Sequence, residues 1–167
     1  GFAALTDHPI DMGLVRKIYD DWETFFGLEE KHDFTFNQET QDGFFSLKNA
    51  ESAKGVSVQD HKEYFHFYPW GQCPTRLKNE LLRYYTSAQA FAKILLQKVE
   101  DFAPEPVSGQ FLEPLSGMID QSDSSLLRIL HYPPVPEGAD LPRASAHEDI
   151  NLLTLLPASS GPGLEIL

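Results

Sequence analysis

Two stretches of the chain repeat apolar residues at the spacing of an amphipathic helix. Between residues 11 and 26 the apolar positions recur every three or four residues, after a candidate cap at Asp11 and before Gly27. The longer stretch, residues 75–100, carries one continuous apolar stripe. Both patterns predict helices with one buried face, and we expect the longer helix to pack against a sheet.

Shorter apolar runs separated by Gly and Pro predict strands in the rest of the chain. The first is the aromatic-rich KEYFHFYPW at 62–70, and the second is LLRILHY at 126–132. The stretch RASAHEDINLLTLL at 143–156 reads as a buried strand with a polar head, and LEIL at 164–167 as the start of another. Residues 28–59 keep no sustained period, so we expect a loop with short strands.

Helices followed by a run of strands are the order expected of an α+β domain. We therefore predict N-terminal helices packed on an antiparallel sheet or jelly roll, that is, a double-stranded β-helix. A chain of 167 residues can bury one core, so we expect a single domain. Residues 1–125 would form its helical and aromatic part, and residues 126–167 the first strands of the jelly roll.

The charge and cysteine content narrow the classes of partner and compartment. The formal net charge is −12, from 25 acidic and 13 basic side chains, and such a field repels nucleic acids and anionic membrane surfaces. No apolar run reaches the length of a membrane span. The one cysteine, Cys73, cannot form an internal disulfide, which is typical of a reducing compartment, and we expect a cytoplasmic protein.

The polar head of the 143–156 stretch contains the candidate chemistry. His147 and Asp149 are two positions apart, so on a strand both side chains leave by the same face. An imidazole and a carboxylate suit a divalent iron, and a third ligand from another strand would complete a two-histidine, one-carboxylate triad. The alternative is a structural one, in which a histidine at the end of a strand is hydrogen-bonded to a nearby acid.

Several motifs in a fixed order carry a resemblance to a known family. The sequence RASAHEDINLLTLLPASSGPGLEIL resembles that of the iron(II)- and 2-oxoglutarate-dependent oxygenases of the isopenicillin N synthase-like family. In that family a His-x-Asp pair precedes an apolar LLTLL strand and a GLE turn. LLRILHYPP, KEYFHF and GFAALTDHPI also resemble family segments, in the family order. The resemblance therefore runs through nearly the whole chain.

The resemblance assigns roles to three residues. His147 and Asp149 match the first two iron ligands, and Tyr132 matches the tyrosine that helps to hold 2-oxoglutarate, the implied cosubstrate. Two positions depart from the family pattern. Leu130 stands where many members have asparagine, and Pro9 stands where the opening turn has glycine; neither position ligates the metal.

The other histidines offer no obvious third ligand. His131 neighbours Tyr132 but should point to the opposite face of the strand. His61 and Glu63 form a second pair with the same spacing, which either binds a metal or belongs to a solvated arm.

Strand parity adds candidate residues for a substrate pocket. Arg128 has the parity of Tyr132 and could offer a cation to a carboxylate, or form an ion pair at the sheet surface. Asn151, Leu153 and Leu155 have the parity of the metal pair. They would line an apolar pocket with one amide, or be ordinary core residues.

Both ends of the chain fall inside apparent strands, at residues 1–8 and 164–167, so we expect a piece of a longer protein, truncated at both ends. The family's distal histidine and its Arg-x-Ser motif are absent from these residues. The resemblance implies hydroxylation, desaturation or ring closure of a small organic substrate with O2, and the chain alone would be inactive. The alternative function is that of an inactive fragment or a non-catalytic binding module.

Overall fold

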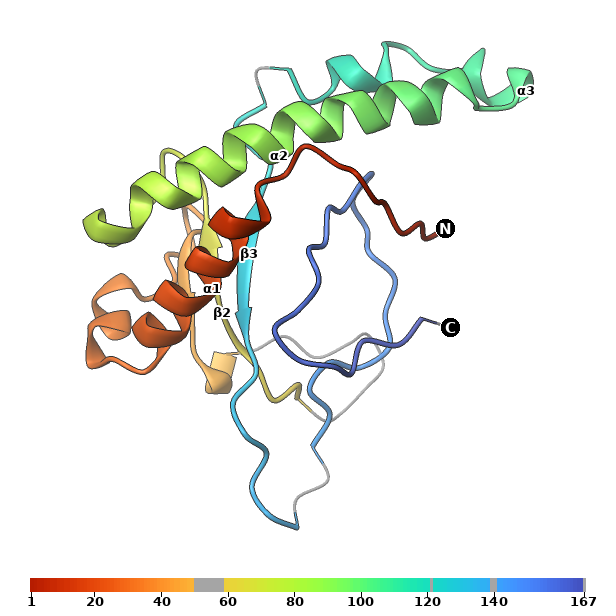
Figure 1. The fold of residues 1–167 in the computed structure, drawn as a ribbon. Coiled ribbons are helices and arrows are strands. Elements are labelled where there is room, and N and C mark those ends of the chain that lie inside the picture. The colour runs from red at the N-terminus through yellow and green to blue at the C-terminus, as the bar shows by residue number, and fades with distance from the viewer. Residues whose placement is uncertain (50–58, 121, 139–140, 167) are drawn as a thin grey trace.

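The computed structural model describes residues 1–49, 59–120, 122–138 and 141–166, and Figure 1 shows their arrangement. Residues 50–58 of the predicted loop therefore lie outside the described residues. In chain order the elements are α1 (Met12–Phe26), η1 (Glu29–Phe34), β1 (Gly43–Phe45), η2 (Leu47–Asn49), β2 (Glu63–Phe67), α2 (Thr75–Asp101), α3 (Glu105–Ser108), η3 (Leu115–Gly117) and β3 (Leu127–His131).

A three-stranded antiparallel sheet forms the centre of the described structure. Its order is β1-β2-β3, so β2 is the middle strand. Phe65 of β2 lies opposite Phe44 on one side and Ile129 on the other. Each residue of β2 is buried, as expected of a strand with a neighbour on both sides. The strands predicted at 62–70 and 126–132 are confirmed, and β1 is one of the short strands expected before residue 59.

Helix α1 follows the predicted pattern closely. Asp11 caps it, because Oδ1 accepts hydrogen bonds from the backbone N–H groups of Gly13 at 2.8 Å and Leu14 at 3.1 Å. At the other end Lys31 Nζ donates to the carbonyl oxygen of Phe26 at 2.7 Å, which satisfies one of the last helical acceptors. The apolar stripe of the sequence is buried: Leu14, Val15, Ile18, Trp22, Phe25 and Phe26.

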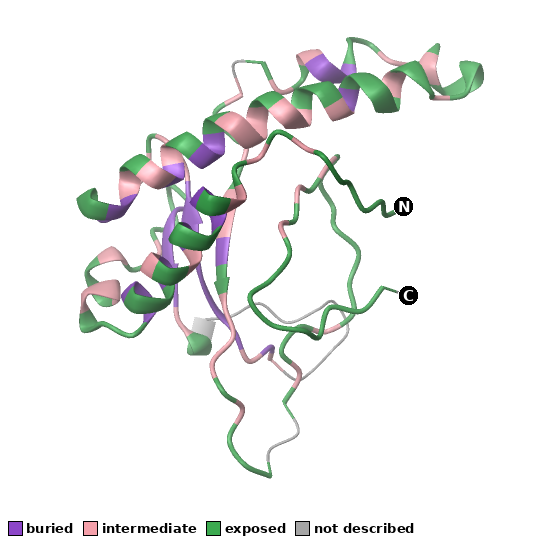
Figure 2. Ribbon diagram, in the orientation of Figure 1, coloured by how far each residue is buried: buried purple, intermediate pink, exposed green. Residues whose placement is uncertain are grey.

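The core lies where the two long helices cover one face of the sheet (Figures 1 and 2). The indole of Trp22 on α1 is 1% exposed, and its ring centroid is 4.9 Å from that of Phe65 on β2. Helix α2 reaches the same face through Tyr85, whose ring is 6.3 Å from that of Phe67. The sheet and both helices therefore meet in one aromatic cluster.

Helix α2 packs on the sheet only through its first half. Leu77, Leu81, Tyr84 and Tyr85 are buried, whereas Val99, near its end, is 50% exposed. The second half contacts η3 instead, and Figure 1 shows it extending past the sheet. Among the helices of the described residues, none combines the length and the apolar character that crossing a bilayer requires.

The structure differs from the sequence prediction at residues 1–8, 143–156 and 164–166, where it has irregular backbone instead of strands. A strand is stabilised by ladder hydrogen bonds to a neighbour, and within the described ranges these segments pair with none. The apolar run after residue 150 therefore stays largely exposed, including Ile150 and Leu152. The α+β class is confirmed, while the jelly roll stays a prediction.

The Trp22 contact predicts a large loss of stability on truncation. Trp22→Ala should lower the free energy of unfolding by about 3–5 kcal/mol, since it removes a fully buried aromatic side chain and leaves a cavity. Urea denaturation followed by circular dichroism measures this. Trp70, which is 51% exposed, provides the matched control. Trp70→Ala should lower the free energy of unfolding by less than about 1.5 kcal/mol, the contribution of one hydrogen bond. Equal losses of stability in Trp22→Ala and Trp70→Ala would contradict the assignment of the core.

A buried carboxylate predicts acid sensitivity. Glu63 is 4% exposed, with Lys31 Nζ at 3.0 Å from Oε2 and His131 Nδ1 at 2.8 Å from Oε1. Burial raises the pKa of Glu63, but the bonds from His131 and Lys31 outweigh it and bring the pKa below its ordinary value of 4.5. The ionised carboxylate therefore adds stability above pH 4.5, and that stability is lost as the pH falls through the lower folded-state pKa.

Glu63→Gln should accordingly be less stable than the unmodified protein at neutral pH, and the difference should shrink below pH 4.5. Urea unfolding at a series of pH values checks this. The exposed Glu113 gives the control, since Glu113→Gln should leave the pH profile unchanged. A Glu63→Gln deficit that does not vary with pH would contradict the prediction.

Candidate functional site

The two faces of the sheet carry different side chains. On β2, Glu63, Phe65 and Phe67 point toward the helices, whereas Tyr64 and His66 point to the other face. The register places Arg128 of β3 beside His66, on that second face. Phe45 stacks on Tyr64 there, with ring centroids 4.5 Å apart. The face away from the helices therefore combines aromatic and cationic groups, and Phe45, Tyr64 and His66 are buried there.

Arg128 lies on this second face, as its parity predicted. Its guanidinium carbon is 4.9 Å from the centroid of the Tyr64 ring, in cation–π geometry. Its Nε donates a hydrogen bond of 3.0 Å to His66 Nε2. Because His66 Nε2 accepts, the ring proton belongs on Nδ1, which lies 3.2 Å from the carbonyl oxygen of Gln41. His66 is thereby a neutral imidazole that helps to hold the arginine against the sheet.

Tyr132 follows β3 and is half-buried. Burial raises the pKa of its phenol, and the negative charge of Asp60 raises it further, while the positive charge of Arg128 partly offsets both. The hydroxyl therefore stays protonated at neutral pH. A protonated phenol can donate a hydrogen bond to a carboxylate ligand, which is the role that the resemblance implied.

The predicted metal pair is brought together, although not on a strand. His147 Nε2 and Asp149 Oδ1 are 3.7 Å apart, and both side chains are about half exposed. Two neighbouring ligand atoms, each about 2 Å from one cation, lie about 3 Å apart, so a closure of about 0.7 Å would let both atoms bind one metal ion. A nitrogen and an oxygen donor also suit iron(II). The pair therefore fits the group that the sequence predicted.

Each member of the pair has a hydrogen-bonded partner behind it. His147 Nδ1 donates to the carbonyl oxygen of Ser145 at 2.7 Å, which leaves the lone pair of Nε2 available to a metal ion. Asp149 Oδ2 accepts a bond of 2.5 Å from Thr154 Oγ1. The same hydroxyl oxygen accepts from Asn151 Nδ2 at 2.8 Å. Such partners orient the ligands of a metal site.

The remaining pocket candidates have separate positions. Asn151 is exposed and bonded to Thr154, so here it supports the carboxylate of Asp149. Leu153 and Leu155 are half-buried, and their neighbours Leu152, Thr154 and Leu156 are exposed. A pocket formed by these residues stays a prediction.

Two further predictions concern His131 and the pair of His61 and Glu63. His131 points to the helix face, where it stacks on Phe26 with ring centroids 5.1 Å apart, as parity predicted. Glu63 faces the same side and is occupied by Lys31 and His131, whereas His61 Nε2 contacts the carbonyl oxygen of Pro134 at 3.3 Å. The structure therefore gives no support to the His61–Glu63 pair as a metal site. Within the described ranges, no group of three His, Cys, Asp or Glu side chains could hold a metal ion.

Sequence reasoning missed Asp60, the carboxylate that positions the metal-pair segment. Its Oδ1 accepts bonds from Ser145 N at 2.9 Å and from Ser145 Oγ at 2.8 Å. The two residues are 85 positions apart, and no local periodicity links them. A buried acid just before a strand is the one signal that the sequence offered.

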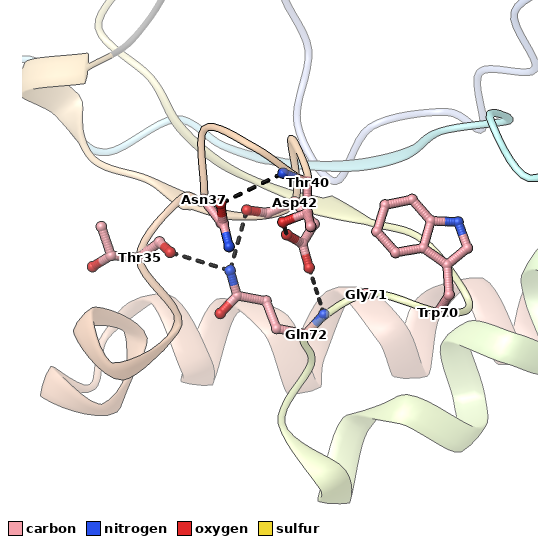
Figure 3. A pocket seen from close by; sticks show the side chains of 7 residues that line it. All are labelled: Thr35, Asn37, Thr40, Asp42, Trp70, Gly71 and Gln72. Carbon is pink, nitrogen blue, oxygen red and sulfur yellow. Dashed lines mark hydrogen bonds between the residues drawn. The ribbon is translucent and has the colours of Figure 1, made fainter.

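A cavity of about 330 Å³ lies away from these residues, between the loops that precede β1 and follow β2 (Figure 3). Asp42 is buried in it and accepts hydrogen bonds of 2.5 Å from Gln72 N and from Thr40 Oγ1. A Cβ atom at Gly71 would come within 2.7 Å of Asp42 Oδ2, so only glycine allows this approach. The polar groups satisfy one another, and we interpret the cavity as a junction between loops. Its lining residues are Thr35, Asn37, Thr40, Asp42, Trp70, Gly71 and Gln72.

Two curated proteins are similar in sequence to this chain. The chain matches no protein-family profile. It is 26% identical to Protein SRG1 of Arabidopsis thaliana, over 99% of this chain and 48% of that protein. It is also 26% identical to the 2-oxoglutarate-dependent dioxygenase ucsF of Acremonium sp, over 99% of this chain and 57% of that protein.

A solved structure is similar as well. The crystal structure of a "putative oxygenase" from Shewanella oneidensis superposes with a TM-score of 0.76 at 46% sequence identity, covering 89% of this chain and 52% of that one. The chain thus spans about half the length of the curated relatives that it matches. These similarities confirm the resemblance that the motifs predicted: the chain is a relative of the 2-oxoglutarate-dependent dioxygenases.

Proposed function

We propose that the native protein is an iron(II)- and 2-oxoglutarate-dependent oxygenase and that this chain supplies two of its three iron ligands. The observation that carries the proposal is the 3.7 Å approach of His147 Nε2 to Asp149 Oδ1. It occurs in a chain related to a named 2-oxoglutarate-dependent dioxygenase. Bound iron(II), together with O2 and 2-oxoglutarate, would supply the chemistry that oxidises a carbon centre of the substrate.

The residues of this chain would bind and orient the reactants. His147 and Asp149 would hold the metal, fixed from behind by Ser145 and Thr154. The protonated phenol of Tyr132 would donate a hydrogen bond to a carboxylate of 2-oxoglutarate. Arg128 and Tyr132 have the same strand parity, and the positive charge of Arg128 favours anionic groups on this face.

We further propose that the sheet is the beginning of a jelly roll. The relatives are about twice as long as this chain, so their further length can supply strands that cover apolar side chains exposed here. The exposed apolar side chains of Ile150 and Leu152 suit such a covering. The distal histidine and the Arg-x-Ser motif would lie on those strands.

The substrate would be a small organic molecule, because the half-buried Leu153 and Leu155 offer apolar contacts and the net charge of −12 disfavours nucleic acids. The product would be hydroxylated, desaturated or cyclised. The one cysteine, Cys73, cannot form an internal disulfide, which is typical of a reducing compartment, and we propose a cytoplasmic location. The non-catalytic binding module is not favoured by these relatives.

The first experiment is to sequence the source gene beyond the codon for Leu167. We expect the reading frame to continue through strand-forming sequence to a histidine and then an Arg-x-Ser motif, because an iron triad needs a third ligand. A stop codon directly after Leu167 would contradict this expectation and favour the binding module.

Replacement of the ligating imidazole tests the site in the full-length protein. His147→Ala should lower the formation of succinate from 2-oxoglutarate by more than about a hundredfold, since even partners behind the ligands contribute 10–100-fold. The assay follows succinate with iron(II), O2 and 2-oxoglutarate. His32, exposed on η1, gives the control, and His32→Ala should retain turnover. Unchanged turnover in His147→Ala would refute the assignment.

A further inference from the structure

A buried acid–base pair precedes the central strand and has no part in the core. Asp60 is 4% exposed and Lys62 is 7% exposed, and Asp60 Oδ2 lies 2.8 Å from Lys62 Nζ. Removing two charges from water is costly, and a second set of hydrogen bonds must compensate for it. The other carboxylate oxygen of Asp60, Oδ1, has separate hydrogen-bond partners.

That oxygen holds the segment that carries the metal pair. Asp60 Oδ1 accepts two hydrogen bonds from one residue, from Ser145 N at 2.9 Å and from Ser145 Oγ at 2.8 Å. A third bond lies alongside, since the backbone N–H of His61 donates to the carbonyl oxygen of Pro142 at 2.7 Å. Residues 142–145, which pair with no strand in the described part of the chain, are thereby tied to the start of β2.

Ser145 passes this constraint to the imidazole. Its carbonyl oxygen accepts from His147 Nδ1 at 2.7 Å, so the ring proton is fixed on Nδ1 and Nε2 keeps its lone pair. That nitrogen faces Asp149 Oδ1 at 3.7 Å. An unbroken series of contacts therefore leads from Asp60 through Ser145 to the ligating atom of His147. The negative charge of Asp60 also acts on Tyr132, the other proposed site residue.

We propose that Asp60 is a positioning residue of the iron site. Through its two hydrogen bonds to Ser145, it sets the tautomer and orientation of His147. The inference rests on the proposed function, since it concerns the same site. Asp60 itself touches neither metal nor substrate in this scheme. Its effect on His147 passes through Ser145.

The first test uses a readout that needs no metal. In the metal-free full-length protein, the ¹⁵N chemical shifts of the His147 ring should show the proton on Nδ1 at a pH where the ring is neutral. Asp60→Ala should shift the population toward the Nε2–H tautomer, because Ser145 is no longer held. The same tautomer population in Asp60→Ala and in the unmodified protein would overturn the inference.

The second test measures the affinity for Co²⁺, which accepts the same nitrogen and oxygen donors as iron(II), by titration calorimetry of the full-length protein. Asp60→Ala should weaken Co²⁺ binding by about 10–100-fold, as is usual for a partner behind a ligand. Asp60→Asn, which keeps an oxygen acceptor for Ser145, should recover most of the affinity. Asp120→Ala is the matched control, because it removes an exposed aspartate–lysine pair, with Lys93 at 2.6 Å, and should leave the affinity unchanged.

The outcomes separate the inference from the proposed function. If the unmodified protein does not bind Co²⁺, the proposed function fails and the inference fails with it. If it binds Co²⁺ and Asp60→Ala binds equally well, only the inference is overturned. Should Asp60→Ala not fold, Ser145→Ala provides the test: it loses one of the two bonds to Asp60 and should weaken Co²⁺ binding by about three- to tenfold. Unchanged binding would then overturn the inference.

Discussion

The contact between Trp22 and Phe65 is the interaction on which the rest of the structure depends. It joins α1 to the middle strand, and the antiparallel register then carries its effect to both neighbouring strands. Because strand residues alternate, burying Phe65 against the helices commits Tyr64 and His66 to the opposite face. The composition of the second face, on which Arg128 also lies, is therefore a direct consequence of aromatic packing on the face that the helices cover.

Periodicity in the sequence was enough to predict elements that depend on local spacing. The apolar stripes placed both long helices within a residue of their observed bounds, and strand parity placed Arg128 and His131 on opposite faces correctly. For residues 143–156 the same reasoning predicted a strand that the structure does not have, because an apolar run becomes a strand only when a neighbour supplies hydrogen bonds. His147 and Asp149 still lie close together, since two residues so near in sequence can approach each other without a strand.

Long-range polar contacts were beyond prediction from one sequence. Asp60 and Ser145 are both common residue types and lie 85 positions apart. The local sequence around either residue does not indicate that the two are in contact. The same holds for Glu63 with Lys31, which are 32 positions apart. In both cases a buried carboxylate lies near the start of β2 and meets a cation. Burial makes these contacts specific, because a charge that loses water needs exact partners.

The absence of a ladder around Ser145 in the described structure has a consequence for motion. A segment held by a few hydrogen bonds, each worth about 1 kcal/mol, opens locally at far lower cost than the aromatic core unfolds. His147 and Asp149 are thus carried by a part of the molecule that can detach and return while the sheet stays intact. Under the proposed function, metal binding and order in this segment would form a single coupled equilibrium, in which each favours the other.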